Sequence, residues 1–311
     1  MYRNSRTADD AADTTPALTP QGLIRLTHYP PPISLQPYFT TLFTLECDEH
    51  RITDTLPAAV GYLAIVLQGT GSLRFASGRI DPAYPETLLA PTNAAVGLEV
   101  DGPLRMVAAA LSPLGWFALT GRDAARWADR ADEAGSVLGD GVHELGDRFR
   151  AGWTNGSLNA EAMAQALSVQ LAGQLQKLNP EHVRLARIVS DWLSTSLDPA
   201  LADLQAQLDY SARQLQRLIT RYFGCAPKQL MRKYRALRVA ALLQAPGVSD
   251  ERIAQLLNLF YDQSHMIREI RHFTGRTPQR LVAGAESVLA AATGLGNYTQ
   301  IKPNIARMPD D

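Results

Sequence analysis

The C-terminal third of the chain contains one helical pattern twice, at an offset of 51 residues. Each copy begins at a residue that caps helices, continues with apolar residues at helical spacing, and closes with a glycine that is followed three residues later by a proline. The repeat therefore predicts two similar helical units. The matching positions are Ser211 with Asp262, Leu215 with Met266, Arg217 with Arg268, Ile219 with Ile270, Gly224 with Gly275, and Pro227 with Pro278.

The first copy has the parts of a helix-turn-helix motif. Asp198-Pro199 is typical of a helix start and precedes a short helix, Asp209-Tyr210 forms the turn, and Ser211 begins the next helix. Gln214 stands where it completes a capping box with Ser211. The apolar stripe that predicts the buried face of this second helix is Leu215, Leu218, Ile219 and Tyr222.

A longer helix joins the two copies. Pro227 occupies its first position, and Ala245-Pro246-Gly247 ends it. Ser249 then caps a fifth helix, and Asp262 caps a sixth helix that buries an apolar stripe of its own. With a first amphipathic helix over 185–193, these elements predict an all-α domain over residues 180–285.

The rest of the chain has a different pattern. Short apolar runs separated by glycine and proline occupy residues 25–111 and predict a mostly β unit, and helical spacing begins at Pro113. Asn179-Pro180 breaks the last of these helices, so we place a domain boundary there. The predicted fold class is α+β: a flexible arm over 1–20, a mostly β sensor or dimerisation domain with following helices over 21–179, the all-α domain over 180–285, and a tail over 286–311.

Leucines recur at helical spacing in the segment 158–178, at Leu167, Leu171, Leu175 and Leu178. Such a stripe predicts burial on one helix face. Two interpretations stay open: the stripe packs within its own domain, or it forms a homodimer interface.

Charge is divided unevenly along the chain. The net charge of −1 combines 13 basic and 19 acidic residues in 1–179, 15 basic and 9 acidic residues in 180–285, and 2 basic and 3 acidic residues in 286–311. A one-signed block on a folded domain indicates a polyanion as partner, because neutralising phosphates releases counterions. The alternative is an ordinary solvated helix face. The block runs from Tyr210 to Ser249 without an acidic residue and contains Arg213, Arg217, Arg221, Lys228, Arg232, Lys233, Arg235 and Arg238.

Over Glu181 to about Ala285 the sequence resembles the AraC/XylS family of transcription regulators. The resemblance rests on Tyr261 to Arg268 followed by Phe273 to Pro278, and on Arg213 to Arg217 followed by Gly224 to Lys228. It implies a unit of about seven helices with two helix-turn-helix motifs, double-stranded DNA as partner, and a contact with RNA polymerase when such a protein activates transcription. More weakly, Ala90 to Thr92 and Leu111 to Trp116 resemble the uncharacterised sensor-like domains of some members, which implies a small-molecule effector.

Both turns depart from the family pattern. The positions that usually hold a small residue and a turn glycine are Gln205 and Asp209 in the first motif, and Gln255 and Leu259 in the second. Leucine tolerates positive φ poorly, so the second turn must be reshaped or include one more residue.

The exposed faces of the two second helices supply the candidate DNA contacts, because hydrogen-bonding side chains read base edges in the major groove. The two helices would enter successive groove segments roughly 34 Å apart, with the helix from Lys228 to Gln244 setting their spacing. For each residue the alternative is an ordinary surface position. We assign base reading to Arg213, Gln214, Arg217, Gln263, Ser264, His265 and Arg268. We assign phosphate contacts to Ser211, Arg221, Lys228, Lys233, Arg235, Arg238 and Arg271.

An effector pocket in the N-terminal domain would be lined by the aromatic residues Tyr62, Phe75, Trp116 and Phe117, although such residues also fill ordinary cores.

Other functional classes find less support. A DNA-repair alkyltransferase needs an activated cysteine, and neither Cys47 nor Cys225 has a suggestive set of neighbours in sequence. His28, His50 and His143 are scattered without metal-ligand spacing, so we expect no metal and no cofactor. A protein-interaction module that has lost DNA binding is the remaining alternative. The sequence contains no stretch that predicts a membrane span or a signal peptide, and we expect a cytoplasmic protein that is not an enzyme.

Overall fold

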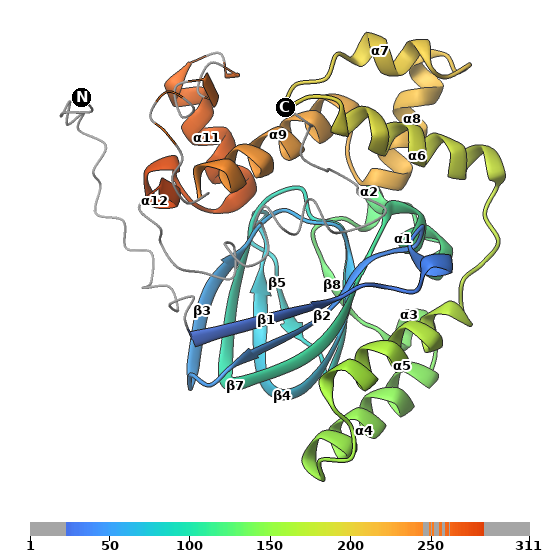
Figure 1. The fold of residues 1–311 in the computed structure, drawn as a ribbon, viewed down its shortest axis with the longest axis vertical. Helices are drawn as coiled ribbons and strands as arrows, with labels where there is room; N and C mark the ends of the chain where they lie inside the picture. The colour runs from blue at the N-terminus through green and yellow to red at the C-terminus, as the bar shows by residue number, and fades with distance from the viewer. Residues whose placement is uncertain are drawn as a thin grey trace.

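The structure is a computed structural model that describes residues 23–244 and 262–282, together with residues 249, 251, 255, 256, 259 and 260. The expected arm, the tail and most of the fifth helix of the C-terminal domain lie outside the described residues. Figure 1 shows a curled β-sheet with the helices α4 and α5 against its side and the C-terminal helices across one end. The predicted α+β class is confirmed.

The strands form one antiparallel sheet in the order β1-β2-β7-β4-β6-β8, with β3 also paired to β7 and β5 to β4. β7 is long enough to pair with β3 over its first part and with β2 over its second. The strands are β1 Ile24–Tyr29, β2 Phe39–Cys47, β3 Arg51–Leu56, β4 Tyr62–Arg74, β5 Ile80–Ala83, β6 Glu86–Leu89, β7 Val96–Leu111 and β8 Ala131–Glu133, and a 3-10 turn η2 spans Ile33–Leu35.

The apolar side chains of the strands are divided between two cores. Leu63 and Ile65 of β4 pack with residues of the surrounding helices, whereas Leu73 of the same strand packs inside the curled sheet with Val96 and Val100 of β7. The pairing register of β4 with β7 shifts between these two parts of the strand. The helices of this domain are α1 Pro113–Thr120, α2 Ala124–Trp127, α3 Gly135–Leu138, α4 Gly141–Thr154 and α5 Ala160–Ala172.

The leucine stripe over 158–178 packs within the chain. Leu167 and Leu171 are fully buried against the sheet, Leu175 packs beside them, and Leu178 contacts the core of the C-terminal helices. α5 also ends at Ala172, well before Leu178. The interpretation of this stripe as a homodimer interface is therefore wrong, because its side chains are already used in the core.

The C-terminal helices follow the predicted amphipathic pattern. Pro227 occupies a first-turn position of its helix, as expected, and Pro180, predicted only as a break, also begins a helix. Asp198 does not cap α7, whose N-cap is Ala200; its carboxylate instead accepts a hydrogen bond from Arg235 at 3.0 Å. None of the described helices is both long and apolar enough to cross a membrane. The helices are α6 Pro180–Ser194, α7 Leu201–Ala206, α8 Ala212–Phe223, α9 Pro227–Leu243, α11 Gln263–Thr274 and α12 Pro278–Val282.

Candidate nucleic-acid interface

The first motif consists of α7 and α8, and α8 begins with the predicted capping box. Ser211 Oγ accepts a hydrogen bond from the backbone N–H of Gln214 at 3.3 Å, and Gln214 Oε1 accepts one from the backbone N–H of Ser211 at 3.1 Å. The side-chain oxygen of Gln214 is therefore held at the start of the helix. In this conformation that oxygen is not available for the bidentate contact to adenine that a base-reading glutamine makes.

The two faces of α8 differ in character. Leu215, Leu218 and Ile219 are buried in the C-terminal core, whereas Arg213 and Arg217 are exposed on the opposite face. Arg221, one turn further on, places its guanidinium 4.5 Å from the ring centroid of Phe117 in α1. The first two arginines thus face solvent, and the third is held against the N-terminal domain.

The second motif presents α11 in the same way. Asp262 Oδ1 accepts a hydrogen bond from the backbone N–H of His265 at 2.7 Å and so caps the helix. Met266, Ile270 and Phe273 are buried, as predicted. The exposed side chains are Gln263, Ser264, Arg268, Arg271 and His272, and Arg268 Nε donates to the carbonyl of Ser264 at 3.3 Å.

Both second helices end in the same geometry. Gly224 and Gly275 have φ of 83° and 75°, and their N–H groups donate to the carbonyls of Thr220 and Arg271. A left-handed residue at this position favours glycine. The duplication seen in sequence is therefore also a duplication of local structure.

The first turn avoids a left-handed conformation at its unusual residue. Among the described residues Asp129 is the only non-glycine with positive φ, so Asp209 does not adopt that conformation. In the second motif the N–H of Leu259 donates to the carbonyl of Leu256 at 3.3 Å. The other residues of the second turn, whose reshaping or lengthening the sequence predicts, lie outside the described residues.

A buried carboxylate in α11 organises several of the basic residues. Glu269 is fully buried, with Arg232 Nε at 2.9 Å and Arg235 Nη2 at 2.8 Å from its two oxygens. His265 Nε2 lies 3.6 Å from the same carboxylate. The assignment of Arg235 to phosphate is corrected here, because this side chain is mostly buried and pairs with Glu269 and Asp198. His265 likewise lies inside this network and is only partly exposed.

Two further basic residues of α9 are buried. Arg238 donates to the carbonyls of Leu193 and Ser196 at the end of α6, where a helix leaves carbonyls without intrahelical partners. Lys233 donates to two carbonyls of the N-terminal domain. The assignments of Lys233 and Arg238 to phosphate are corrected for this reason. Lys228 and Arg271 stay exposed and are still candidates for that role.

The four aromatic residues proposed for an effector pocket do not meet. Phe75 lies inside the curled sheet with Tyr62 at the edge of that core, Trp116 lies in the core between sheet and helices, and Phe117 packs on Tyr222 of α8. Phe75 and Trp116 are fully enclosed. This pocket assignment is therefore wrong, because its members fill three separate packing clusters.

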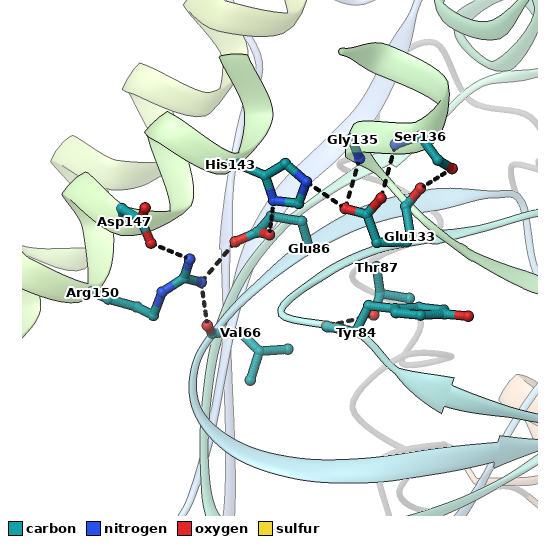
Figure 2. A network of polar contacts seen from close by, with 10 residues as sticks. All are labelled: Val66, Tyr84, Glu86, Thr87, Glu133, Gly135, Ser136, His143, Asp147 and Arg150. Atoms are coloured by element: carbon teal, nitrogen blue, oxygen red, sulfur yellow. Dashed lines mark hydrogen bonds and ion pairs between the residues drawn. The ribbon is translucent and has the colours of Figure 1, made fainter. Parts of the chain in front are cut away.

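One polar cluster of the sheet domain was not predicted. His143 of α4 lies with Nδ1 2.7 Å from Glu86 of β6 and Nε2 2.7 Å from Glu133 of β8 (Figure 2). Arg150 Nη1 contacts the other oxygen of Glu86 at 2.7 Å, and Glu133 also accepts hydrogen bonds from the N–H groups of Gly135 and Ser136.

The donor atoms of Glu86, Glu133 and His143 lie within 4.8 Å of one another, as a metal site requires. The chemistry of the cluster favours an ion network instead, because both ring nitrogens of His143 face carboxylates and Arg150 already neutralises Glu86. The hydrogen bond that His143 donates to Glu86 raises the pKa of His143 above its ordinary value. The three residues are far apart in sequence, so their spacing contained no signal of the cluster.

Comparison with known proteins supports the interpretation of the C-terminal region. Residues 204–283 match a family model described as a helix-turn-helix domain. Among solved structures the chain is similar to ToxT from Vibrio cholerae O395, with 10% identity, a TM-score of 0.44, and coverage of 85% of this chain and 98% of that chain.

Two further solved structures are similar to this chain. One is ToxT bound to (E)-4-(8-methylnaphthalen-1-yl)but-3-enoic acid, with 10% identity, a TM-score of 0.45, and coverage of 78% and 99%. The other is the AraC-like transcriptional activator CuxR, with 9% identity, a TM-score of 0.32, and coverage of 76% and 81%. No curated protein matches the chain.

The family match covers both helices whose caps agree, α8 and α11. The match over 204–283 spans α8, α9 and α11, together with the turns that precede the two second helices. The C-terminal helices of this chain thus match a helix-turn-helix domain over residues 204–283.

Proposed function

We propose that this protein is a sequence-specific regulator of transcription that binds double-stranded DNA through α8 and α11. The observation that carries the proposal is the pair of helices with matched caps, matched closing glycines and exposed polar faces, within a segment that matches a helix-turn-helix domain. Helices of this kind place hydrogen-bonding side chains against base edges in the major groove.

The exposed residues divide into two roles under this proposal. Arg213 and Arg217 of α8 read bases, because an exposed guanidinium suits the two acceptors of guanine. On α11 the readers are Gln263, Ser264 and Arg268. Ser211, Lys228 and Arg271 lie exposed at or near helix ends and hold the phosphate backbone.

The basic residues that pair with Glu269 have a structural role instead. Arg232 and Arg235 join α9 to Glu269 of α11, so the helix between the motifs is fastened to the second of them. Because α9 connects α8 to α11, this fastening contributes to the spacing with which the two helices enter successive groove segments, roughly 34 Å apart.

A non-enzymatic role is consistent with the state of the thiols. Cys47 and Cys225 are both buried. Burial raises the pKa of Cys225 to about 11, which disfavours the thiolate that an alkyltransferase needs as nucleophile.

The proposal is tested by binding to the DNA upstream of the protein's own gene, in rising salt and with random DNA as competitor. We expect Arg217→Ala to weaken binding to the specific site by about 5- to 150-fold and to change binding to random DNA little. Lys228→Ala serves as the matched control. It should weaken both by a similar factor and reduce the salt slope by about one.

Two results would count against the proposal. Equal losses on specific and random DNA for Arg217→Ala would remove its role in base reading. A wild-type protein without preference over the competitor would support a protein-interaction module instead.

A further inference from the structure

Two segments of the sheet domain face the C-terminal helices, and we call them the clamp segments. One is residues 54–59, at the end of β3 and in the connection to β4; the other is residues 91–95, between β6 and β7. Both lie at the end of the sheet over which α9 and α11 are placed in Figure 1. Their contacts reach both helix-turn-helix motifs.

The end of α8 is held by Asn93. Its side-chain Nδ2 donates to the carbonyl of Gly224, the left-handed residue that closes α8, at 3.1 Å. Asn93 is itself fixed, because its backbone N–H donates to Asp129 at 2.7 Å. The closing residue of the first recognition helix is thus bonded to the sheet domain.

The end of α11 is held in the same manner by backbone donors. The N–H of Ala95 donates to the carbonyl of His272 at 2.9 Å, and the N–H of Ala58 donates to that of Phe273 at 2.7 Å. Carbonyls in the last turn of a helix have no intrahelical partner and need outside donors. One donor comes from each clamp segment.

The helix between the motifs is held by a buried lysine. Lys233 Nζ donates to the carbonyl of Ala59 at 2.9 Å and to that of Thr92 at 2.7 Å, one from each clamp segment. Burial lowers the pKa of Lys233 to about 8, and both the charged and the neutral amine are able to donate these bonds.

An ion pair completes the contact just after α11. Arg276 and Asp54 are both buried and bonded to each other, and Arg276 Nη1 donates to the carbonyl of Thr55 at 3.2 Å. A Cβ on Gly275 would collide with the Thr55 side chain, so the approach is close. A buried pair of this kind favours one arrangement strongly, because separating it leaves uncompensated charge.

We infer that the clamp segments fix the relative position of α8 and α11, so that Asp54 and Asn93 are positioning residues for DNA recognition although they lie outside the DNA-binding domain. The consequence for DNA rests on the proposed function. The claim that the clamp segments fix the relative position of α8 and α11 is the geometric part of the inference. It does not rest on the proposed function, because all the contacts lie within the chain. A ligand or partner that displaces these segments acts on both motifs together.

The geometric part is tested with spin labels on the two recognition helices of the full chain. Exposed Gln216 and Gln263 are replaced by cysteine and labelled, while the native cysteines are buried. We expect one narrow distance distribution in the otherwise unchanged protein, and loss of that single distance in Asp54→Asn and in Asn93→Ala. Asp48→Asn is the control, since Asp48 pairs with Arg25 and Arg105 outside the clamp segments.

The outcomes separate the clamp from the proposed function. Near-UV circular dichroism identifies folded variants, and Asn93→Ala is the milder change because it removes one hydrogen bond without unpairing a charge. A narrow, unshifted distance in folded Asn93→Ala and Asp54→Asn overturns the inference. In unlabelled protein, the same variants should lose preference for the specific DNA over random DNA. If the spin-label distances broaden in the variants but the wild-type protein shows no preference for the specific DNA, the inference about the clamp segments is supported and the proposed function is contradicted.

Discussion

The two recognition helices are alike at their ends and differ in where their charged side chains lie. α8 and α11 each begin at a side-chain cap and each close at a left-handed glycine. On α8, Arg213 and Arg217 face solvent, whereas α11 contains the buried Glu269 that gathers cations from α9. The two copies share the caps and the closing glycines that helix ends need, whereas their charged residues differ.

The difference assigns unlike mechanical roles to the two motifs. α11 is tied to α9 by the ion pairs of Glu269 within the DNA-binding domain. α8 packs on α1 of the N-terminal domain, where Arg221 lies over Phe117 and Tyr222 contacts the same ring. We therefore expect substitutions at equivalent positions to have unequal effects where these contacts differ, and equal effects where the local structure is the same.

The largest effect is expected for Glu269→Ala. Removing this carboxylate leaves Arg232 and Arg235 without their buried partner, which should lower the free energy of unfolding by about 3–5 kcal/mol. Urea unfolding measures the loss. Asp203→Ala, an exposed acidic residue of α7, is the control and should change stability by less than about 0.5 kcal/mol. A similar small effect for both variants would mean that the Glu269 network does not hold α11.

The closing glycines provide a matched pair of substitutions. Gly224→Ala and Gly275→Ala each force a left-handed alanine, at a cost of about 1–2 kcal/mol. Gly275→Ala should cost about 1–3 kcal/mol more, because its Cβ meets Thr55, whereas that of Gly224 finds its nearest neighbour, Pro91, at 3.5 Å. Thermal unfolding of the two variants compares them directly. Equal losses would contradict the close approach at Gly275.

The caps should behave alike. Ser211→Ala and Asp262→Ala each remove a side-chain acceptor from the first turn, and each should destabilise the protein by about 1 kcal/mol. Denaturant unfolding of the two variants tests whether the duplication extends to the energetics of the helix starts. A loss confined to one of them would show that it does not.

The smallest expected effect is a dependence on pH that belongs to the first motif alone. His182 bonds to the hydroxyl of Tyr222 at 2.8 Å, and burial, followed by the charge of Arg221, lowers the pKa of His182. As the pH falls below about 6.5, the unfolded chain takes up the proton before the folded one does, so stability decreases. Amide protection factors, which correct for the slower intrinsic exchange at lower pH, should therefore fall in α8 more than in α11 on acidification. His182→Gln should abolish this difference; its persistence in that variant would assign it to another group.

Local features of the C-terminal domain were predictable from the sequence because their causes are local. Ser211 with Gln214, Asp262, Gly224 and Gly275 follow from requirements that act within one or two helical turns. The buried stripe of α11 follows from its periodicity. These features also identified the kind of domain.

The fate of the basic residues was not predictable, because their partners lie far away in sequence. Lys233 bonds to Ala59 and Thr92, and Arg235 to Glu269, at separations that no local pattern reveals. The interval from Tyr210 to Ser249, which has no acidic residue, predicted a continuous phosphate-binding surface. In the structure, acidic residues of α11 and of the segment before α7 pair with a basic residue of this interval.

The aromatic residues failed as a guide for a related reason. Composition does not distinguish a ring that lines a pocket from one that fills a core, and Phe75 and Trp116 fill cores. His143 was missed from the sequence because it has no metal-ligand spacing, yet the fold brings it together with Glu86 and Glu133 from two other segments.

The most direct test of the account is a hydroxyl-radical footprint of the full-length protein on the DNA upstream of its own gene. If α8 and α11 both enter the major groove, protection should appear in two segments separated by about one helical turn. Arg217→Ala should weaken one of these segments more than the other, and Arg268→Ala should do the reverse. A single protected segment, or equal weakening of both by each variant, would contradict the claim that two recognition helices read one duplex.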